Sequence, residues 1–141
     1  MTDYVGLFTS ELDRIDCKYQ IIDAEDHLIK IQVRAQNSAY TCYVDFDEGE
    51  NNEQESSAHL MILQIAHASD DTYSNAIVAC NALNRQYRWV KFTIDGDNDI
   101  NSEMDIELDP NSAGEETTRS LFRLLNITDK SYPIIMKALY A

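Results

Sequence analysis

The stretch from Asn81 to Leu108, NALNRQYRWVKFTIDGDNDINSEMDIEL, decides the fold of this chain. It reads as the end of a helix followed by two strands, Arg88 to Ile94 and Ile100 to Leu108, in which apolar and polar residues alternate. Asp95-Gly96-Asp97-Asn98-Asp99 separates the strands, and these residue types tolerate the positive backbone angles of a tight turn. The stretch therefore predicts an antiparallel hairpin.

The pattern of this hairpin also predicts its register and an exposed aromatic side chain. With the turn centred near Asp97, Lys91 is expected opposite Glu103, an exposed pair that contributes at most ~1 kcal/mol. Trp89 falls on the polar face of its strand and is expected to be exposed. An exposed Trp is a common interface anchor because it combines a large apolar area with a polar tip. The alternative is that a chain terminus or a second subunit covers it.

The residues before this stretch predict a helix and four strands. Leu7, Phe8, Leu12 and Ile15 recur at helical spacing, which indicates a helix over Tyr4 to Ile15. Alternating or continuous apolar runs predict the strands, and the last run is short and apolar enough to lie centrally in a sheet. The four strands are expected over Tyr19 to Asp23, Leu28 to Arg34, Tyr40 to Phe46 and His59 to Ala66. The acidic stretch Asp47 to Ser57 is expected to be a hairpin loop, either a plain connection or a docking loop.

Three further helices are expected around the hairpin. One begins at Ser69 and buries a stripe made of Tyr73, Ile77, Cys80 and Leu83 with Ala76. The second opens at Ser112 and ends at Asn126. The third places Pro133 in its first turn, where the missing amide hydrogen costs little. Strands joined by short turns are antiparallel. The whole chain, 1–141, is thus expected to be a single α+β domain of two layers, an antiparallel sheet of five to six strands with helices on one face.

Charge restricts the partners of the chain. It holds 11 Lys and Arg against 25 Asp and Glu, a net charge of −14, and the cations are scattered along the sequence. Nucleic acid and anionic membranes are therefore not expected partners, whereas a basic or amphipathic protein segment would be attracted. The alternative is that the charge serves only solubility. No apolar run approaches the ~20 residues of a membrane span and no leader is visible, so a cytoplasmic protein is expected.

No residue pattern indicates a catalytic, cofactor or metal site. Asp95, Asp97 and Asp99 imitate the start of a calcium loop, but Ile100 and Ile106 replace the Gly and Glu that such a loop needs. The three His are far apart, and the three Cys lack metal-ligand spacing. Cys80 is expected to be a buried, inert thiol. We therefore expect no catalytic residues, no cofactor and no metal, and an enzyme is not predicted.

The sequence resembles the YbjN-like family of bacterial proteins at Asn81, Asn84, Arg88, Trp89 and Lys91, in the turn and acidic strand that follow, and in GEETTRSLFRLL and DKSYPIIMKAL. Members of this family are commonly described as "putative sensory transduction regulators". The resemblance implies a fold similar to type III secretion chaperones, small acidic domains that often dimerise and bind extended segments of other proteins. Fold alone does not establish chaperone function.

These observations predict a non-enzymatic regulatory or chaperone-like protein that acts by contact with a protein partner, as a homodimer. Binding would use a sheet surface or edge. The candidate partner-binding residues are Asn81, Asn84, Arg88, Trp89 and Lys91; for Asn81 and Asn84 a purely structural role near the end of their helix is the alternative. The alternative function is a small-molecule-sensing module with a pocket between sheet and helices.

Overall fold

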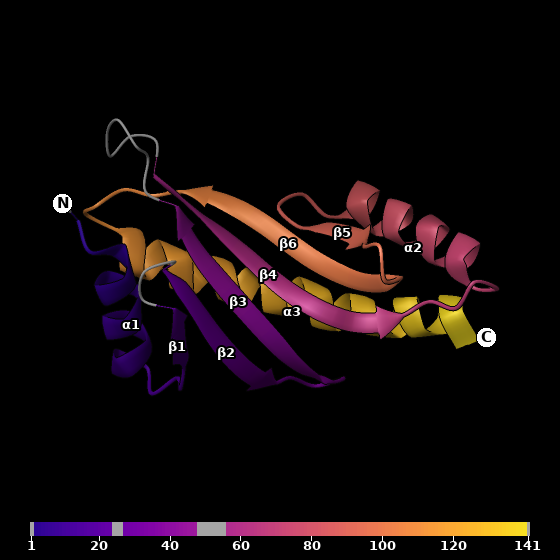
Figure 1. The fold of residues 1–141 in the computed structure, drawn as a ribbon, viewed down its shortest axis with the longest axis horizontal. Helices are drawn as coiled ribbons and strands as arrows, with labels where there is room; N and C mark the ends of the chain where they lie inside the picture. Colours follow the sequence, from indigo (N-terminus) through magenta and orange to yellow (C-terminus); the bar gives the residue numbers. More distant parts are fainter. Residues whose placement is uncertain (1, 24–26, 48–55, 141) are drawn as a thin grey trace.

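The computed structural model describes residues 2–23, 27–47 and 56–140. Within these ranges six strands form one antiparallel sheet in the order β1-β2-β3-β4-β6-β5, and three helices pack against it (Figure 1). The α+β fold class is therefore confirmed. In chain order the elements are α1 (Tyr4–Arg14), β1 (Gln20–Asp23), β2 (Leu28–Arg34), β3 (Ala39–Asp47), β4 (Ser57–His67), α2 (Tyr73–Gln86), β5 (Lys91–Ile94), β6 (Asp99–Glu107) and α3 (Ala113–Tyr140).

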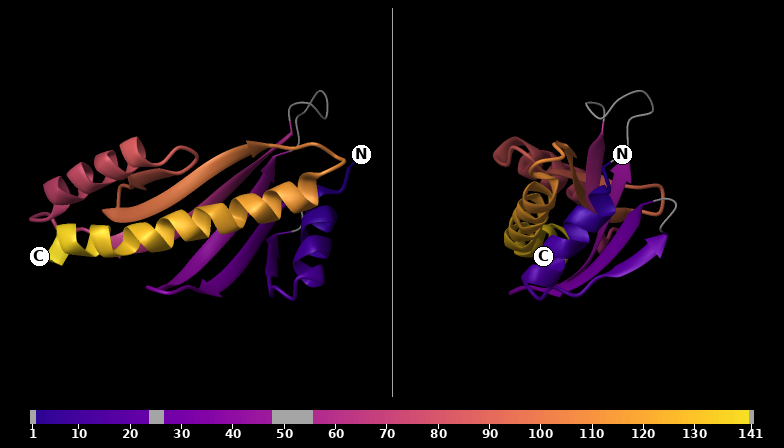
Figure 2. Two further views of the ribbon diagram at one scale, coloured as in Figure 1. Left: turned by 180° about the vertical axis from the view of Figure 1, so that it is seen from behind. Right: turned by 90° about the vertical axis from the view of Figure 1, so that its left-hand side faces the viewer.

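The sheet has one buried and one open face, as its alternating residues predict. In β3 the side chains of Tyr40, Cys42, Val44 and Phe46 are buried, while those between them are half-buried. β4 supplies Leu60 and Ile62, both fully buried, and it lies in the interior of the sheet as expected. Burying one such side chain contributes roughly 1.5–3 kcal/mol, so this face holds much of the core. The helices cover it and leave the opposite face open (Figure 2).

One long helix, α3, runs along the sheet and is crossed near its start by α1 (Figure 2). At 1.5 Å per residue its 28 residues span about 42 Å. Gly114 lies where the two helices meet, and a Cβ added there would come 2.6 Å from the carbonyl oxygen of Leu7. Only glycine permits this approach. α1 itself begins as expected, with the Asp3 carboxylate accepting a hydrogen bond from the Gly6 amide at 2.9 Å.

The prediction of two C-terminal helices is wrong, because α3 continues through Asn126 and keeps Pro133 in its interior. A proline there cannot donate to the carbonyl four residues earlier, which belongs to Asp129. The structure supplies another donor. Asn37, in the β2–β3 turn, donates a hydrogen bond from its side-chain amide to that carbonyl at 2.9 Å. The helix can therefore continue, because a residue 92 positions away satisfies the orphaned acceptor.

The prediction for α2 needs two corrections. The helix begins at Tyr73 rather than Ser69, because Ser69 and Thr72 form a turn in which each hydroxyl accepts from the other's backbone amide. Its buried residues are Ala76, Ala79, Cys80 and Leu83, whereas Tyr73 and Ile77 are exposed. The buried stripe is thus rotated toward small side chains, which allow the helix to lie close to its neighbours.

The hairpin register is confirmed, but its first strand is shorter than expected. Lys91 pairs with Glu103, as the turn chemistry predicts. Asn98 takes the positive φ of 63° that the turn requires. However, β5 begins at Lys91 rather than Arg88, so Trp89 lies before the strand. The chain bends at residues 88 and 89 to connect α2 with β5, and this connection overrides the alternating pattern.

Asn101 is buried, although its position in the alternation predicts exposure to solvent. The pairing of β4 with β6 shifts between Ile62 and Ala66, and Gln64 in this bulge has a positive φ of 57°. Asn101 accepts from the Gln64 amide at 2.8 Å and donates to Asp95 at 3.0 Å, so its side chain fills the bulge. The expected loop between β3 and β4 falls largely on residues 48–55, outside the described residues.

Candidate protein-interaction site

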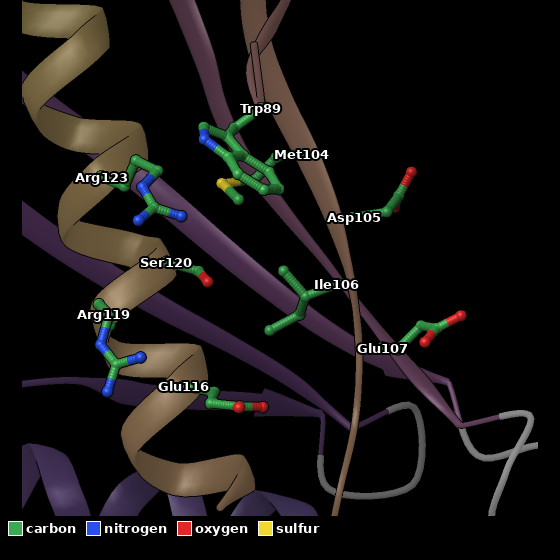
Figure 3. Close-up of a pocket in the computed structure, with 9 residues that line it drawn as sticks. All are labelled: Trp89, Met104, Asp105, Ile106, Glu107, Glu116, Arg119, Ser120 and Arg123. Carbon is green, nitrogen blue, oxygen red and sulfur yellow. The ribbon is translucent and has the colours of Figure 1, made fainter.

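A groove of about 330 Å³ lies between β6 and α3 (Figure 3). Met104 and Ile106 of β6 point toward the helix and form an apolar floor, and Trp89 closes one end (Figure 3). The wall formed by α3 carries polar side chains, from Glu116, Arg119, Ser120 and Arg123. Asp105 and Glu107 border the groove but point away from it (Figure 3). The groove therefore combines an apolar floor with a wall that includes two guanidinium groups.

Trp89 is 62% exposed, so its expected exposure is confirmed. The guanidinium carbon of Arg123 lies 5.0 Å from the ring centroid, which is a cation–π contact. Such a contact contributes about 0.5–1 kcal/mol at an exposed site. It holds the indole against the end of the groove while leaving most of its surface accessible to a partner.

Beside this groove the outer edge of β6 lacks a strand. β5 pairs only with Ile100 to Glu103, so β6 extends four residues beyond it. The Leu108 amide donates to the Ser56 carbonyl on the β4 side, and backbone groups along a strand alternate in direction. The amides and carbonyls of Asp105 and Glu107 consequently face the outer edge. No strand or side chain of the described residues pairs with them there.

The outer edge of β5, in contrast, is closed by Asn84. Its side-chain oxygen accepts from the Phe92 amide at 2.6 Å, and its side-chain nitrogen donates to the Phe92 carbonyl at 3.1 Å. The Asn84 amide thus occupies the position of a partner strand, which blocks pairing with another chain. Asn81 lies one turn earlier on the same helix and is exposed, and its side chain makes no hydrogen bond within the described residues.

Acidic side chains gather on the open face of the sheet next to the free edge. His59 of β4 lies opposite Asp105, with Nδ1 2.5 Å from a carboxylate oxygen, and its Nε2 lies 3.5 Å from Glu103. The Asp105 side chain nevertheless remains 65% exposed, and Glu107 is exposed beyond it. A chain that pairs with this edge therefore meets negative charge on the open face.

α2 and β5 form a region without carboxylates. Residues 72–94 contain no Asp or Glu, although the whole chain has 25, and they include three of its cations. On this region Ile77 is 45% exposed and Val78 is 69% exposed. Its exposed side chains are consequently apolar, neutral polar or positive, on a molecule of net charge −14.

The five predicted partner-binding residues do not share one surface. Trp89 reaches the groove, Asn84 closes the β5 edge, and Lys91 lies opposite Glu103 on the open face. Asn81 and Arg88 are exposed. Sequence reasoning missed two groove residues, Arg119 and Arg123. Their spacing of four residues, which places them on one side of a helix, is the signal that could have identified them.

The candidate calcium residues act as turn residues. One Asp95 carboxylate oxygen accepts from the Asp97 and Asp99 amides, and the other accepts from Asn101. The hydrogen bonds from Asn101 and from the Asp99 amide lower the pKa of Asp95, because they favour the charged carboxylate. The oxygens of the three Asp come within 4.8 Å of one another, but the hydrogen bonds of Asp95 account for this placement.

The buried thiols are not activated. Burial raises the pKa of Cys80 to about 11, so this thiol stays protonated near neutral pH, as its position on the buried face of α2 predicts. The pKa of Cys42 is raised to about 12 by burial.

None of the described helices is long and apolar enough to cross a membrane.

Comparison with known proteins identifies both a family and a fold. Residues 8–133 match the YbjN family, described as "Putative bacterial sensory transduction regulator". The structure is similar to the crystal structure of YbjN from E. coli, described as "a putative transcription regulator", with a TM-score of 0.57 and 10% sequence identity. The match covers 93% of this chain and 94% of that protein, and at this identity it shows a shared fold. No curated protein matches the chain.

Proposed function

The chain belongs to the YbjN family, whose members are described as putative bacterial sensory transduction regulators, and from this premise we propose that it regulates another protein by direct contact at the groove beside Trp89. The observation that carries the proposal is the exposed indole, held by Arg123 at the end of a groove with an apolar floor. Exposed Trp and Arg side chains beside an apolar pocket are typical of the residues that dominate binding energy in protein interfaces.

Charge supports a protein partner rather than a nucleic acid. Direct binding to phosphates draws its affinity from Lys and Arg, and this chain has a net charge of −14. The two cations on the groove wall, Arg119 and Arg123, are accompanied by Glu116 on the same wall. Regulation in this proposal therefore acts through protein contact, without a reaction catalysed by the chain itself.

Site-specific photo-crosslinking in bacterial cells tests the proposal. A photoreactive residue at Arg119, which is exposed on the groove wall, is expected to give an adduct of defined mass. The same residue at Lys137, exposed near the end of α3, serves as the control and should give no such adduct. Trp89→Ala should weaken the Arg119 adduct by about tenfold, because losing a central aromatic anchor costs roughly 2 kcal/mol of binding.

Equal adducts from both positions, or an Arg119 adduct unaffected by Trp89→Ala, would contradict a specific contact at the groove. An adduct with a metabolite instead of a protein would favour a small-molecule-sensing module. The specific observation behind this second candidate is that the groove lies between β6 and α3, with an aromatic ring and a guanidinium at one end.

We also propose that the protein forms a homodimer through the exposed face of α2. Two copies with a net charge of −14 repel each other, and residues 72–94 form a surface where they can meet without opposing carboxylates. Light scattering with size-exclusion chromatography should give a mass near twice 16.1 kDa. Val78→Asp, at a position 69% exposed, should reduce the mass to that of one chain, whereas Tyr140→Asp on α3 should not. A monomer at all concentrations and salt conditions would refute the dimer.

A further inference from the structure

The groove and the free backbone groups of β6 are two parts of one surface. The groove lies along the face of β6 that carries Met104 and Ile106. The unpaired amides and carbonyls of Asp105 and Glu107 lie at the edge of the same strand, next to the groove. A strand added here would pair with β6 beyond Glu103, on the same side of β6 as β5. Exposed strand edges of this kind can pair with an extended segment, whose backbone then gives affinity and whose side chains give specificity.

We infer that an extended partner segment in which basic residues alternate with apolar ones adds to β6 beside Asp105 and Glu107 as a seventh strand. This inference rests on the proposed function and specifies the partner chemistry at the same groove. Side chains directly opposite each other in an antiparallel pair lie on the same face. Residues opposite Asp105 and Glu107 therefore lie on the open face, and the residue opposite Ile106 lies in the groove.

Charge determines which residues fit these positions. On the open face the segment meets Asp105, Glu107 and Glu103, which favours Lys or Arg there. On the groove face it meets the apolar floor and Trp89, and a Lys in this position would lie beside Arg119 and Arg123. The favoured pattern is consequently basic, apolar, basic, apolar. A second copy of β6 is disfavoured, because it would place carboxylates against carboxylates.

The comparison of the two sheet edges near α2 supports this assignment. Asn84 closes the β5 edge by bonding both backbone groups of Phe92, but no described residue does the same for Asp105 or Glu107. The chain bends at residues 88 and 89, before β5 begins at Lys91, so β5 does not pair with β6 beyond Glu103. The free edge and the closed edge thus lie on neighbouring strands of one sheet.

A synthetic peptide, acetyl-Lys-Val-Lys-Ile-Lys-Val-Lys-amide, is the probe. Trp89 is the only Trp of the chain, so its fluorescence reports binding to the full-length protein without a label. We expect a saturable change with this peptide and none with its counterpart in which Glu replaces Lys. A peptide of the same composition with its Lys and apolar residues in separate blocks should bind at least about tenfold more weakly. Such a peptide cannot place all its Lys on the open face and all its apolar residues on the groove face.

Methylation of single peptide nitrogens tests strand pairing directly. Residues opposite Asp105 and Glu107 exchange hydrogen bonds with the edge, while the residues between them direct their backbone groups away from it. N-methylation of either of the two Lys amides that pair with Asp105 and Glu107 should weaken binding by about tenfold per blocked bond, and N-methylation of the Val and Ile amides should have less than about a twofold effect. Hydrogen exchange should slow at the amides of Asp105 and Glu107 when peptide is bound.

One protein variant complements the peptides. Glu107→Pro removes an amide that faces the outer edge, at the last residue of β6, and should weaken peptide binding. Glu107→Gln is its matched control, because it removes the same charge and keeps the amide. If N-methylation of the Lys amides and N-methylation of the Val and Ile amides weaken binding equally, strand addition is refuted. It is also refuted if the peptide binds without slowing hydrogen exchange at Asp105 and Glu107. In that event a groove adduct at Arg119 would leave the proposed function standing.

Discussion

Asp129→Ala is expected to lower the free energy of unfolding by about 3 kcal/mol, the largest effect we predict. The Asp129 carboxylate accepts from the Gln36 amide at 3.2 Å, the Asn37 amide at 2.9 Å and the Tyr40 hydroxyl at 2.8 Å. It lies at a buried position in α3 and joins the β2–β3 turn to the helix. Its removal leaves three donors without an acceptor, and each unsatisfied buried group costs roughly 1–3 kcal/mol. The Gln36 and Asn37 amides belong to exposed residues and can still bind water, so the predicted loss of stability stays at the lower end of the summed range.

Urea unfolding at neutral pH measures this loss. Lys130→Ala, at the next residue of the same helix and exposed, is the matched control and should change the free energy by less than about 0.5 kcal/mol. Asp129→Asn should lie between the two, because the amide keeps one acceptor but replaces the other with a donor. Equal stability of Asp129→Ala and the wild type would show that the carboxylate does not hold the turn.

The same residue predicts how stability depends on pH. Burial by itself would raise the pKa of Asp129, but hydrogen bonds from Tyr40 and from the amides of the turn outweigh it, and the pKa is lowered overall. A carboxyl whose folded-state pKa lies below its unfolded value of about 3.9 stabilises the protein above that pH, and this contribution is lost as the pH falls through the folded-state value. Between pH 7 and about 3 the wild type should therefore lose more stability than Asp129→Asn does.

Asn84→Ala is expected to lower the free energy of unfolding by about 2 kcal/mol. The substitution removes both hydrogen bonds between the Asn84 side chain and the backbone of Phe92. Phe92 is 1% exposed, whereas Asn84 itself is exposed, as Asn81 is. Alanine is a better helix former than asparagine by up to ~0.7 kcal/mol, which offsets part of the loss. Chemical denaturation of the purified protein measures the difference.

Asn81→Ala makes the same chemical change one turn earlier in α2 and is the control. The Asn81 side chain is exposed and makes no hydrogen bond within the described residues, so the gain in helix propensity should leave the protein unchanged or slightly more stable. If both variants lose equal stability, the contact between Asn84 and Phe92 is not what stabilises this edge. A further expected consequence of Asn84→Ala is self-association, because the outer edge of β5 is then open.

The sequence predicts the helices and strands well where one local pattern controls the backbone. β2 matches its expected bounds, Leu28 to Arg34, and the register that pairs Lys91 with Glu103 follows from turn chemistry alone. It predicts less well where a distant residue supplies a hydrogen bond. The sequence around Pro133 predicts the start of a helix, and only the hydrogen bond from Asn37 to the Asp129 carbonyl explains why the helix continues there. The alternating pattern predicts that Asn101 is exposed, and only the bulge at Gln64 explains why it is buried.

The candidate site was only partly predictable for the same reason. The exposure of Trp89 follows from its place in an alternating pattern, although the pattern wrongly includes it in the strand. Its contact with Arg123 joins residues 34 positions apart in the chain, and the free edge of β6 exists because β5 is short. Both depend on how α2, β5 and α3 pack together, which is not encoded in any single local pattern.

By itself the sequence determined the α+β class, the family, the net charge of −14 and the turn of the hairpin. These properties follow from composition and from residues close together in the chain, since backbone preferences and alternation act over a few residues. The tertiary structure decided that α3 continues through Pro133, that Asn84 closes one edge, and that the neighbouring edge of β6 stays open beside a groove. Each of these depends on hydrogen-bonding groups from separate elements, which only the packed fold brings within 3 Å or leaves unpaired.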